Sequence, residues 1–253
     1  MSIYFSQLRS PQVAEAAESG AVPVLPVGQT EQHGPHLPIN TDALVAQRVC
    51  EEAVRRLDGK PPAYVLDTVC YGYSQKAVQQ WPGTFVVPQS TVIETVTSLI
   101  VSLVDMGFRK VAVISTHGNH LAAMRAAARE VADRRGVGPG MFFPYATLSD
   151  LMAERSKAGP GGSCHAGELE TSLMLHLAPE LVDMSAATAD DRITALCPYG
   201  KEAFVSTWTR QKSRSGVYGD PTVASAEFGK ELFEKMVDET AGFIRYYREL
   251  KQP

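Results

Sequence analysis

Residues 21–36 read AVPVLPVGQTEQHGPH. The first half of this stretch is a short apolar run that ends at Gly28, which is typical of a buried β-strand. The second half is polar and places Glu31 and His33 two residues apart. In an extended segment, residues two apart point to the same side, so both side chains can reach one point just beyond the strand.

Strand and helix patterns alternate along the rest of the chain. Further strands are expected at residues 63–66, 111–114 and 141–145, and helices at residues 41–57, 91–104, 121–134, 168–177 and 225–250, while residues 186–220 read as irregular. Thr41 and Asp42 occupy the N-cap position of the first of these helices, and Thr91 and Glu94 have capping-box spacing in the second. The alternation predicts a three-layer α/β/α sandwich with a mostly parallel central sheet. Because no linker is visible, we expect residues 1–253 to form a single domain.

The composition is that of an ordinary globular protein. Of the 253 residues, 44% are apolar and 21% are charged, and the formal net charge is −4. This charge argues against a nucleic-acid scaffold, which usually carries a basic face. No apolar run approaches the ~20 residues of a membrane span, and the N-terminus does not resemble a signal peptide. The four cysteines are far apart in the sequence, which favours reduced thiols and a cytoplasmic location.

Histidines and carboxylates are concentrated in three places. Five of the six histidines fall into short clusters, which read EQHGPH at residues 31–36, HGNH at 117–120 and HAGELE at 165–170. The first two clusters directly follow expected strands, and Asp42 can turn back toward the same edge of the sheet. Imidazole and carboxylate groups together suit zinc or manganese, and a carboxylate can bridge two such ions. The combination predicts a metal site, although Asp42 alone would fit an ordinary N-cap and Glu31 alone a solvated loop residue.

These clusters belong to a longer series of motifs. The motifs are PVGQTEQHGPHLP at residues 26–38 with Thr41 and Asp42, WPGT at 81–84, THGN at 116–119, HAGELETS at 165–172 and GDP at 219–221. In this order, over residues 3–245, they resemble the creatininase (creatinine amidohydrolase) family. The resemblance implies a layered α/β fold, a homo-oligomer that is often a hexamer, and two divalent ions per chain, usually zinc or manganese. It also implies hydrolysis of a C–N bond in a cyclic or linear amide.

The resemblance also assigns ligands to each ion. Glu31 and His117 would bind one ion, His33 would bind the other, and Asp42 would bridge both. In creatininase proper, a glutamate two residues after the second-motif histidine completes the second site, and this chain has Asn119 there. Because a carboxylate is still needed to offset the charge of the dication, Glu168 is the expected replacement.

The resemblance assigns the catalytic role to His165. A hydroxide held between the two ions is expected to attack the amide carbonyl, and the His165 imidazole would give a proton to the leaving nitrogen. Glu170 is interpreted as holding a ligand histidine in place, or equally well as an ordinary helix carboxylate. His36 and Asn119 are interpreted as supporting residues.

Aromatic residues bear on the substrate. Tyr73 and Trp81 are expected beside a substrate ring, with buried core positions as the alternative. Creatininase proper has two tryptophans near its third motif that flank the creatinine ring, and neither Trp81 nor Trp208 falls at those places. Relatives also often carry a histidine shortly before the Pro-Gly-Thr motif, where residues 73–80 have none. These departures weaken the case for creatinine more than the case for a metal hydrolase.

Three functions remain open on the sequence. The first is a dinuclear metal-dependent amidohydrolase that acts on a small cyclic or linear amide. The second is a metal-dependent peptidase, or a C–C or C–O hydrolase, in cofactor or small-molecule metabolism. The third is a non-catalytic α/β subunit that binds a small molecule and keeps vestigial ligands. The sequence argues against the third, because it contains the complete set Glu31, His33, Asp42, His117 and His165.

Overall fold

A parallel four-stranded sheet forms the centre of the computed structural model, which describes residues 2–192 and 212–251. The strand order is β2-β1-β3-β4, and each neighbouring pair is parallel. The strands are β1 (Val22–Val27), β2 (Ala63–Val65), β3 (Ala112–Ser115) and β4 (Gly140–Phe142). Residues 193–211, which include Trp208 and much of the stretch expected to be irregular, lie outside the described residues.

Helices supply the rest of the regular structure. The α-helices are α1 (Ser10–Glu18), α2 (Thr41–Arg56), α3 (Gln89–Asp105), α4 (Leu121–Arg135), α5 (Ser149–Arg155), α6 (Glu168–Leu177) and α7 (Ala226–Glu249). Short 3-10 helices are η1 (Phe5–Gln7), η2 (Gly118–His120), η3 (Pro144–Leu148), η4 (Pro179–Leu181) and η7 (Pro221–Val223). Within the described ranges, none of these helices has the length and apolar character needed to cross a lipid bilayer.

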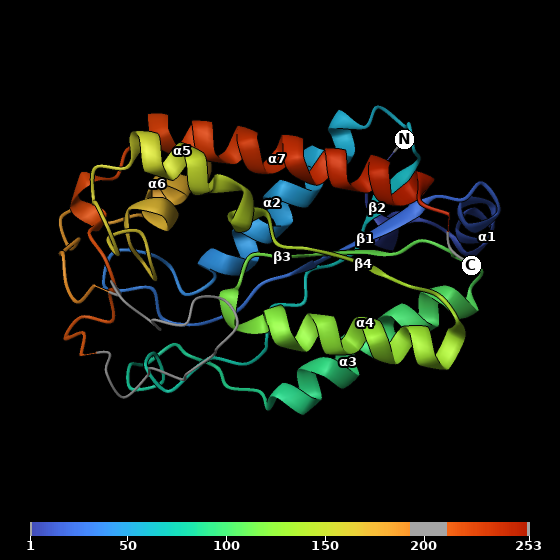
Figure 1. Ribbon diagram of the computed structural model, residues 1–253, viewed down its shortest axis with the longest axis horizontal. Coiled ribbons are helices and arrows are strands. Elements are labelled where there is room, and N and C mark those ends of the chain that lie inside the picture. Colours follow the sequence, from blue (N-terminus) through green and yellow to red (C-terminus); the bar gives the residue numbers. More distant parts are fainter. Residues whose placement is uncertain (1, 193–211, 252–253) are drawn as a thin grey trace.

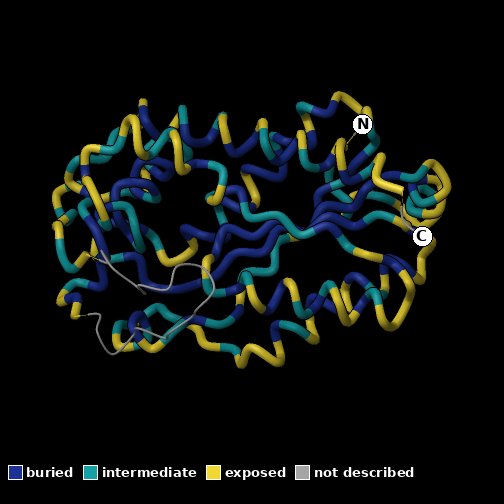
Figure 2. Tube along the Cα trace, viewed as in Figure 1, coloured by how far each residue is buried: buried dark blue, intermediate teal, exposed yellow. Residues whose placement is uncertain are grey.

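The helices cover both faces of the sheet (Figure 1). Successive residues of a strand point to opposite faces, so Val22 and Val24 of β1 pack in one core with α2, α6 and α7. Leu25 and Val27 pack in a second core with α3 and α4. Figure 2 shows the strands buried between these two helical layers. Because both faces are covered, the strands are almost entirely apolar, and the prediction of a three-layer α/β/α fold with a parallel sheet is confirmed.

The strand expected at residues 141–145 is shorter than predicted. It ends at Phe142, and Pro144 opens the 3-10 helix η3. Proline has no N–H group to continue a strand ladder, and its fixed φ suits the first turn of a helix. Tyr145 therefore lies on a helical turn beyond the sheet and not on a strand.

Two helix starts also differ from the prediction. The N-cap residue of α2 is Asn40, so Thr41 and Asp42 belong to the first turn of the helix. The Thr41 hydroxyl donates to the Pro38 carbonyl oxygen (2.7 Å). The N-cap residue of α3 is Pro88, and no side chain caps this helix, so the predicted capping box does not form.

Candidate metal centre

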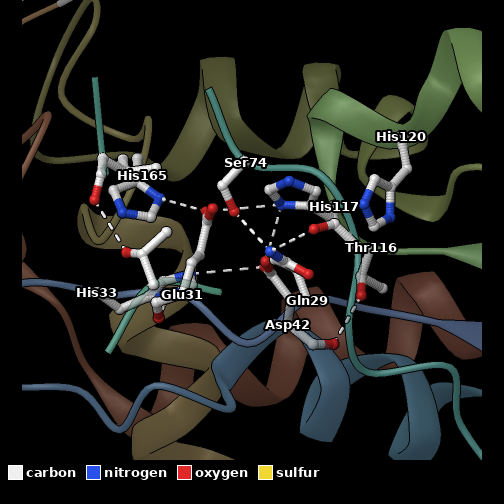
Figure 3. Close-up of polar contacts among 12 residues, drawn as sticks. Gln29, Glu31, His33, Asp42, Ser74, Thr116, His117, His120 and His165 are labelled. Carbon is white, nitrogen blue, oxygen red and sulfur yellow. Dashed lines mark hydrogen bonds and ion pairs between the residues drawn. The ribbon is translucent and has the colours of Figure 1, made fainter. Parts of the chain in front are cut away.

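Acidic and imidazole side chains meet beyond the carboxyl ends of β1 and β3. Glu31 and His33 lie on the loop after β1, His117 follows β3, and Asp42 lies in the first turn of α2. Glu170 comes from the first turn of α6, and His165 comes from the loop before it. Figure 3 shows Glu31, Asp42 and His117 turned toward one another from three different elements. This edge is where parallel α/β sheets bind ligands.

Asp42 lies between two histidines. Its two oxygens are 2.8 Å from His117 Nδ1 and 3.5 Å from His33 Nε2. Glu31 Oε1 is 3.6 Å from His117 Nδ1 and 3.5 Å from His165 Nδ1, and Glu170 Oε2 is 3.6 Å from His33 Nε2. Three groups have ligand atoms within 4.8 Å of one another, namely Glu31–Asp42–His117, His33–Asp42–Glu170 and Glu31–His33–His165. The first two groups share Asp42, as expected for a carboxylate between two ions.

The three imidazoles have one arrangement in common. In each ring, one nitrogen lies within hydrogen-bond distance of a backbone carbonyl oxygen: His33 Nδ1 with Glu31 (3.0 Å), His117 Nε2 with Tyr73 (3.0 Å) and His165 Nε2 with Gln32 (2.7 Å). A carbonyl oxygen only accepts hydrogen bonds, so that nitrogen carries the proton in His33 and His117, whereas His165 Nε2 also lies 3.0 Å from the side-chain amide nitrogen of Gln32. In the neutral ring, the other nitrogen then turns its lone pair toward the carboxylates. Histidines that bind metals are oriented in this way.

The donor atoms at the centre fit a metal ion. Glu31 Oε2 and His33 Nε2 are buried and have no hydrogen-bond partner within the described residues, and Asp42 Oδ2 is buried against His117 Nδ1, which is 2.8 Å away. The side chains of Glu31, His33 and Asp42 are at most 2% exposed. A buried carboxylate is costly unless a cation or hydrogen bonds compensate its charge. Oxygen and imidazole nitrogen together match the ligand preference of zinc and manganese.

Without a cation, protons would have to balance this charge. Burial alone would lower the pKa of His33 and of His117, but Asp42 and Glu31 outweigh burial and raise these values to about 10 and about 9. Burial raises the pKa of Glu170 to about 7. The pKa of His165 is lowered by burial and by the neighbouring His33. Protons therefore compete with a dication for the same nitrogens.

The expected ligand Glu168 does not lie at the centre, and this prediction is corrected. Its carboxylate accepts hydrogen bonds from the backbone N–H groups of Lys157 (2.9 Å) and Ala158 (3.0 Å), as well as from the Ser156 hydroxyl. Two residues along a helix are about 200° apart around its axis. Glu170 therefore faces the centre, where a supporting role had been predicted, and Glu168 faces the loop that leads to His165.

His36, Asn119 and His120 surround the centre without joining the three groups. His36 Nε2 is 2.9 Å from the hydroxyl of Thr171, the residue after Glu170. His120 Nε2 accepts a hydrogen bond from the Tyr73 backbone N–H (3.0 Å). Asn119 lies on η2 and lines the cavity above the cluster. These placements are compatible with supporting roles, which remain predictions.

A cavity of about 320 Å³ opens over the cluster. Neither Tyr73 nor Trp81 lines it, and the aromatic residues in its wall are Phe143 and Tyr145. The Tyr73 side chain packs against the core under α3 and α4, which was the alternative interpretation, and its backbone holds His117. The placement of Tyr73 and Trp81 beside a substrate stays a prediction. Phe143 and Tyr145 were missed because they were assigned to a strand.

Gln32 is a further residue that the sequence pattern did not single out. Besides accepting from His165 at its carbonyl oxygen, it donates from its side-chain amide to the Gly216 carbonyl oxygen (3.0 Å) and accepts at Oε1 from the Gly34 N–H (2.8 Å). Gly216 has a φ of +86°, and a Cβ there would lie 2.2 Å from Gln32 Oε1. The only signal in the sequence was the place of Gln32 between two candidate ligands.

Comparison with known proteins agrees with this geometry. The family model described as "Creatininase: Creatinine amidohydrolase" matches residues 6–244. The chain belongs to the creatininase family. It is 33% identical over 233 residues to the mycofactocin precursor peptide peptidase of Mycobacterium tuberculosis, covering 85% of this chain and 81% of that protein. Membership of this family makes the chain a hydrolase, with the residues of a metal centre in place.

Other relatives carry different names. The chain is 28% identical over 246 residues to the creatinine amidohydrolase of Pseudomonas putida, covering 92% of each. It is 26% identical over 264 residues to the 3-dehydro-scyllo-inosose hydrolase of Thermotoga maritima, covering 96% of this chain and 83% of that protein. A crystal structure of creatinine amidohydrolase matches with a TM-score of 0.85 at 25% identity, covering 99% of each chain. A structure named "Creatininase Mn" matches with a TM-score of 0.84 at 25% identity, covering 99% of this chain and 100% of that one.

Proposed function

We propose that this creatininase-family hydrolase is a dinuclear metal enzyme that cleaves a C–N bond of a small cyclic or linear amide. One observation carries the proposal: Asp42 is shared by two groups of ligand atoms, and each group contains a histidine and a second carboxylate. A single ion would leave one of these groups without a cation. Zinc and manganese are the ions that this donor set favours.

The two ions would be held by different sets of residues. Glu31, Asp42 and His117 would hold one ion, and His33, Asp42 and Glu170 the other. When bound, such ions lower the pKa of water from about 15.7 toward 7 and polarise a carbonyl oxygen. The protein's own contribution is to fix the ligands, and the backbone carbonyl oxygens of Glu31 and Tyr73 do this for two of the histidines.

His165 is suited to carry the proton. The Gln32 carbonyl oxygen fixes the proton on Nε2 and leaves Nδ1 facing Glu31 in the cavity. Nδ1 can take a proton from the attacking water and give it to the leaving nitrogen when the C–N bond breaks. Such acid–base help is typically worth about 10²–10⁴-fold in rate.

The test combines metal content with activity. Purified protein, loaded with zinc or with manganese, is assayed for metal per chain and for hydrolysis of creatinine, simple lactams and short peptides. We expect about two ions per chain and hydrolysis of at least one amide. His165→Ala should keep its metal and lose about 10²–10⁴-fold in kcat, whereas His176→Ala, whose ring packs against Phe233 of α7 and belongs to none of the three groups, should match wild type. Less than half an ion per chain, or a fully active His165→Ala, would refute the proposal.

A short peptide is the second candidate substrate. The higher identity to a mycofactocin precursor peptide peptidase than to a creatinine amidohydrolase supports it. The cavity also supports it, because no tryptophan of the described chain lines its wall. Product analysis separates the candidates, since hydrolysis of a linear peptide gives two fragments, whereas hydrolysis of a lactam gives one ring-opened product heavier by one water. Cleavage of a C–C or C–O bond instead would point to a role nearer the inosose hydrolase.

We also propose that the chain forms a homo-oligomer, a hexamer in the first instance. Apolar residues that remain exposed on the single chain support this, among them Tyr71 (55% exposed), Phe85 (51%) and Val86 (48%). The rings of Tyr71 and Phe85 are in contact, with centroids 5.1 Å apart. Light scattering coupled to gel filtration measures the mass directly, and a mass of one chain would contradict the proposal.

A further inference from the structure

Tyr145 lies in the wall of the cavity above the metal centre. It belongs to η3, directly after β4, where the chain turns over the carboxyl edge of the sheet. The turn is internally bonded, because the Ala146 N–H donates to the Phe143 carbonyl oxygen (3.1 Å) and the Thr147 hydroxyl donates to that of Pro144 (2.7 Å). The position of the Tyr145 ring is therefore set by a well-anchored backbone.

The Tyr145 hydroxyl oxygen is buried and has no hydrogen-bond partner within the described residues. Buried tyrosine hydroxyls usually find a partner, because an unsatisfied buried donor destabilises the folded protein. Tyr145 is a residue of the same cavity wall as Glu31, Asp42 and His165. A ligand in the cavity is the simplest source of the missing partner.

The missing partner has to be a hydrogen-bond acceptor. A phenol has an ordinary pKa of about 10, so its hydroxyl is protonated and can donate at neutral pH. The residues of the three groups that could hold an ion are histidines and carboxylates, and a protonated phenol beside them can donate to the substrate. The strongest acceptor in an amide is the carbonyl oxygen, and this acceptor becomes stronger when the oxygen gains negative charge during attack.

We propose that the Tyr145 hydroxyl donates a hydrogen bond to the carbonyl oxygen of the scissile amide and stabilises the oxyanion that forms there. This inference rests on the proposed function. The attacking water oxygen forms the new C–O bond, and the carbonyl electron pair moves onto its oxygen. When the carbonyl re-forms, the C–N bond breaks and the nitrogen leaves with the proton that His165 carried. Tyr145 keeps its own proton throughout.

The variant Tyr145→Phe removes only this hydroxyl. We expect kcat to fall about 10²-fold, as for the loss of one oxyanion donor, while KM changes by less than about threefold. The shape of the pH profile should not change, because Tyr145 transfers no proton. The substrate is the amide of the panel that metal-loaded wild-type protein hydrolyses fastest. Tyr246→Phe is the matched control, since Tyr246 is 64% exposed on α7.

Two measurements do not depend on turnover. Inorganic phosphate is a tetrahedral anion, and its affinity for the zinc-loaded protein can be measured by calorimetry. We expect Tyr145→Phe, but not Tyr246→Phe, to bind phosphate about tenfold more weakly, the effect of one lost hydrogen bond. The zinc content should equal that of wild type. The melting temperature should stay the same or rise, because the lost hydroxyl bonds to no other described residue.

Several results would overturn the inference. These are an unchanged kcat, a change confined to KM, a loss of zinc, and a phosphate affinity that is equal in both proteins or absent from both. A wild-type protein that hydrolyses no amide counts against the proposed function, whereas the phosphate measurement judges Tyr145 by itself.

Discussion

Glu168 and Glu170 lie two residues apart on α6 and have opposite surroundings. Glu170 is 3.6 Å from His33, while Glu168 bonds to the backbone at Lys157 and Ala158. We predict that Glu170→Gln holds about one zinc ion per chain, because a neutral amide is a poor ligand for a dication. Metal analysis after dialysis measures this.

Glu168→Gln serves as the matched control for Glu170→Gln. It should keep the metal content of wild type and lose about 1–3 kcal/mol of unfolding free energy, because its bonds to the loop are weakened. Denaturant unfolding measures that loss. If Glu168→Gln lost an ion and Glu170→Gln kept both, the assignment of the second site to Glu170 would be wrong.

The raised pKa values of His33 and His117 give metal binding a pH dependence. In the metal-free chain both histidines are protonated on both ring nitrogens at neutral pH, since their pKa values are about 10 and about 9. A metal ion displaces these protons, so its affinity should rise with pH. We predict a gain of about tenfold per pH unit for each displaced proton between pH 6 and 8. Competition with a chromophoric chelator measures it, and an affinity independent of pH would contradict the prediction.

At the scale of the elements, Asp190 joins two loop segments. It lies in the segment that follows η4, and it bonds to the segment that precedes η7. Its Oδ2 accepts hydrogen bonds from the N–H groups of Arg214 and Ser215 (both 2.8 Å) and from the Ser213 hydroxyl (3.1 Å). The next residue, Gly216, accepts the hydrogen bond from the Gln32 amide. Asp190 therefore supports, through two other residues, the carbonyl oxygen that orients His165.

Asp190→Ala should lower the unfolding free energy by about 1–3 kcal/mol at pH 7. Burial raises the pKa of Asp190, but the hydrogen bonds from Ser215 and Arg214 outweigh burial and lower it to about 2. A lowered carboxylate pKa stabilises the fold above the unfolded value of about 3.9, and this contribution disappears as the pH falls toward 2. The difference between variant and wild type should therefore shrink below pH 4. Denaturant unfolding of metal-free protein at several pH values measures it.

Asp133 on α4 offers the control for Asp190→Ala. It is exposed and forms no ion pair with another described residue, so Asp133→Ala should differ from wild type by less than about 0.5 kcal/mol. A stability loss in Asp190→Ala that stayed constant from pH 7 to pH 3 would show that the loss does not come from the ionised carboxylate.

At the scale of the whole molecule, metal should stabilise the fold. The buried carboxylates and histidines of the centre come from loops after two strands and from two helices, so an ion joins elements of both halves of the chain. We predict that chelation lowers the melting temperature by about 5–10 °C, because metal at 100 times its Kd adds about 2.7 kcal/mol. Calorimetry before and after metal is returned measures it. His117→Ala lacks a ligand of one of the two proposed ions and should respond less to the chelator than wild type, and an equal response would contradict the prediction.

The central strands could be predicted from the sequence because their buried positions require a continuous apolar pattern. β1 and β3 lie in the middle of a sheet that is covered on both faces, so nearly all of their residues are apolar. Such apolar runs are recognised in the sequence as buried strands. β4 is an edge strand of three residues, and its boundary was misplaced because Pro144 acts on backbone hydrogen bonding and not on hydrophobicity. The short helices η1 and α1 were not predicted from the sequence.

The centre was partly predictable for a similar reason. Glu31, His33 and His117 follow buried strands closely in the sequence. Residues that follow parallel strands lie at the same edge of the sheet, so their proximity could be predicted from local sequence alone. Glu170 and Glu168 could not be separated in this way, because the choice depends on how α6 is rotated against the sheet. The contact of Gln32 with Gly216 joins residues 184 positions apart, and no local pattern encodes it.

By itself, the sequence determined the layered parallel fold, the family and the set of side chains able to bind a metal, because each depends on residue types at short spacing. Only the tertiary structure decided which carboxylate of α6 faces the candidate metal centre and which nitrogen of each histidine faces the carboxylates there. It also decided that Tyr145, and not Tyr73, stands in the wall of the cavity. These choices depend on the rotation and packing of whole elements, which bring together residues that lie far apart along the chain.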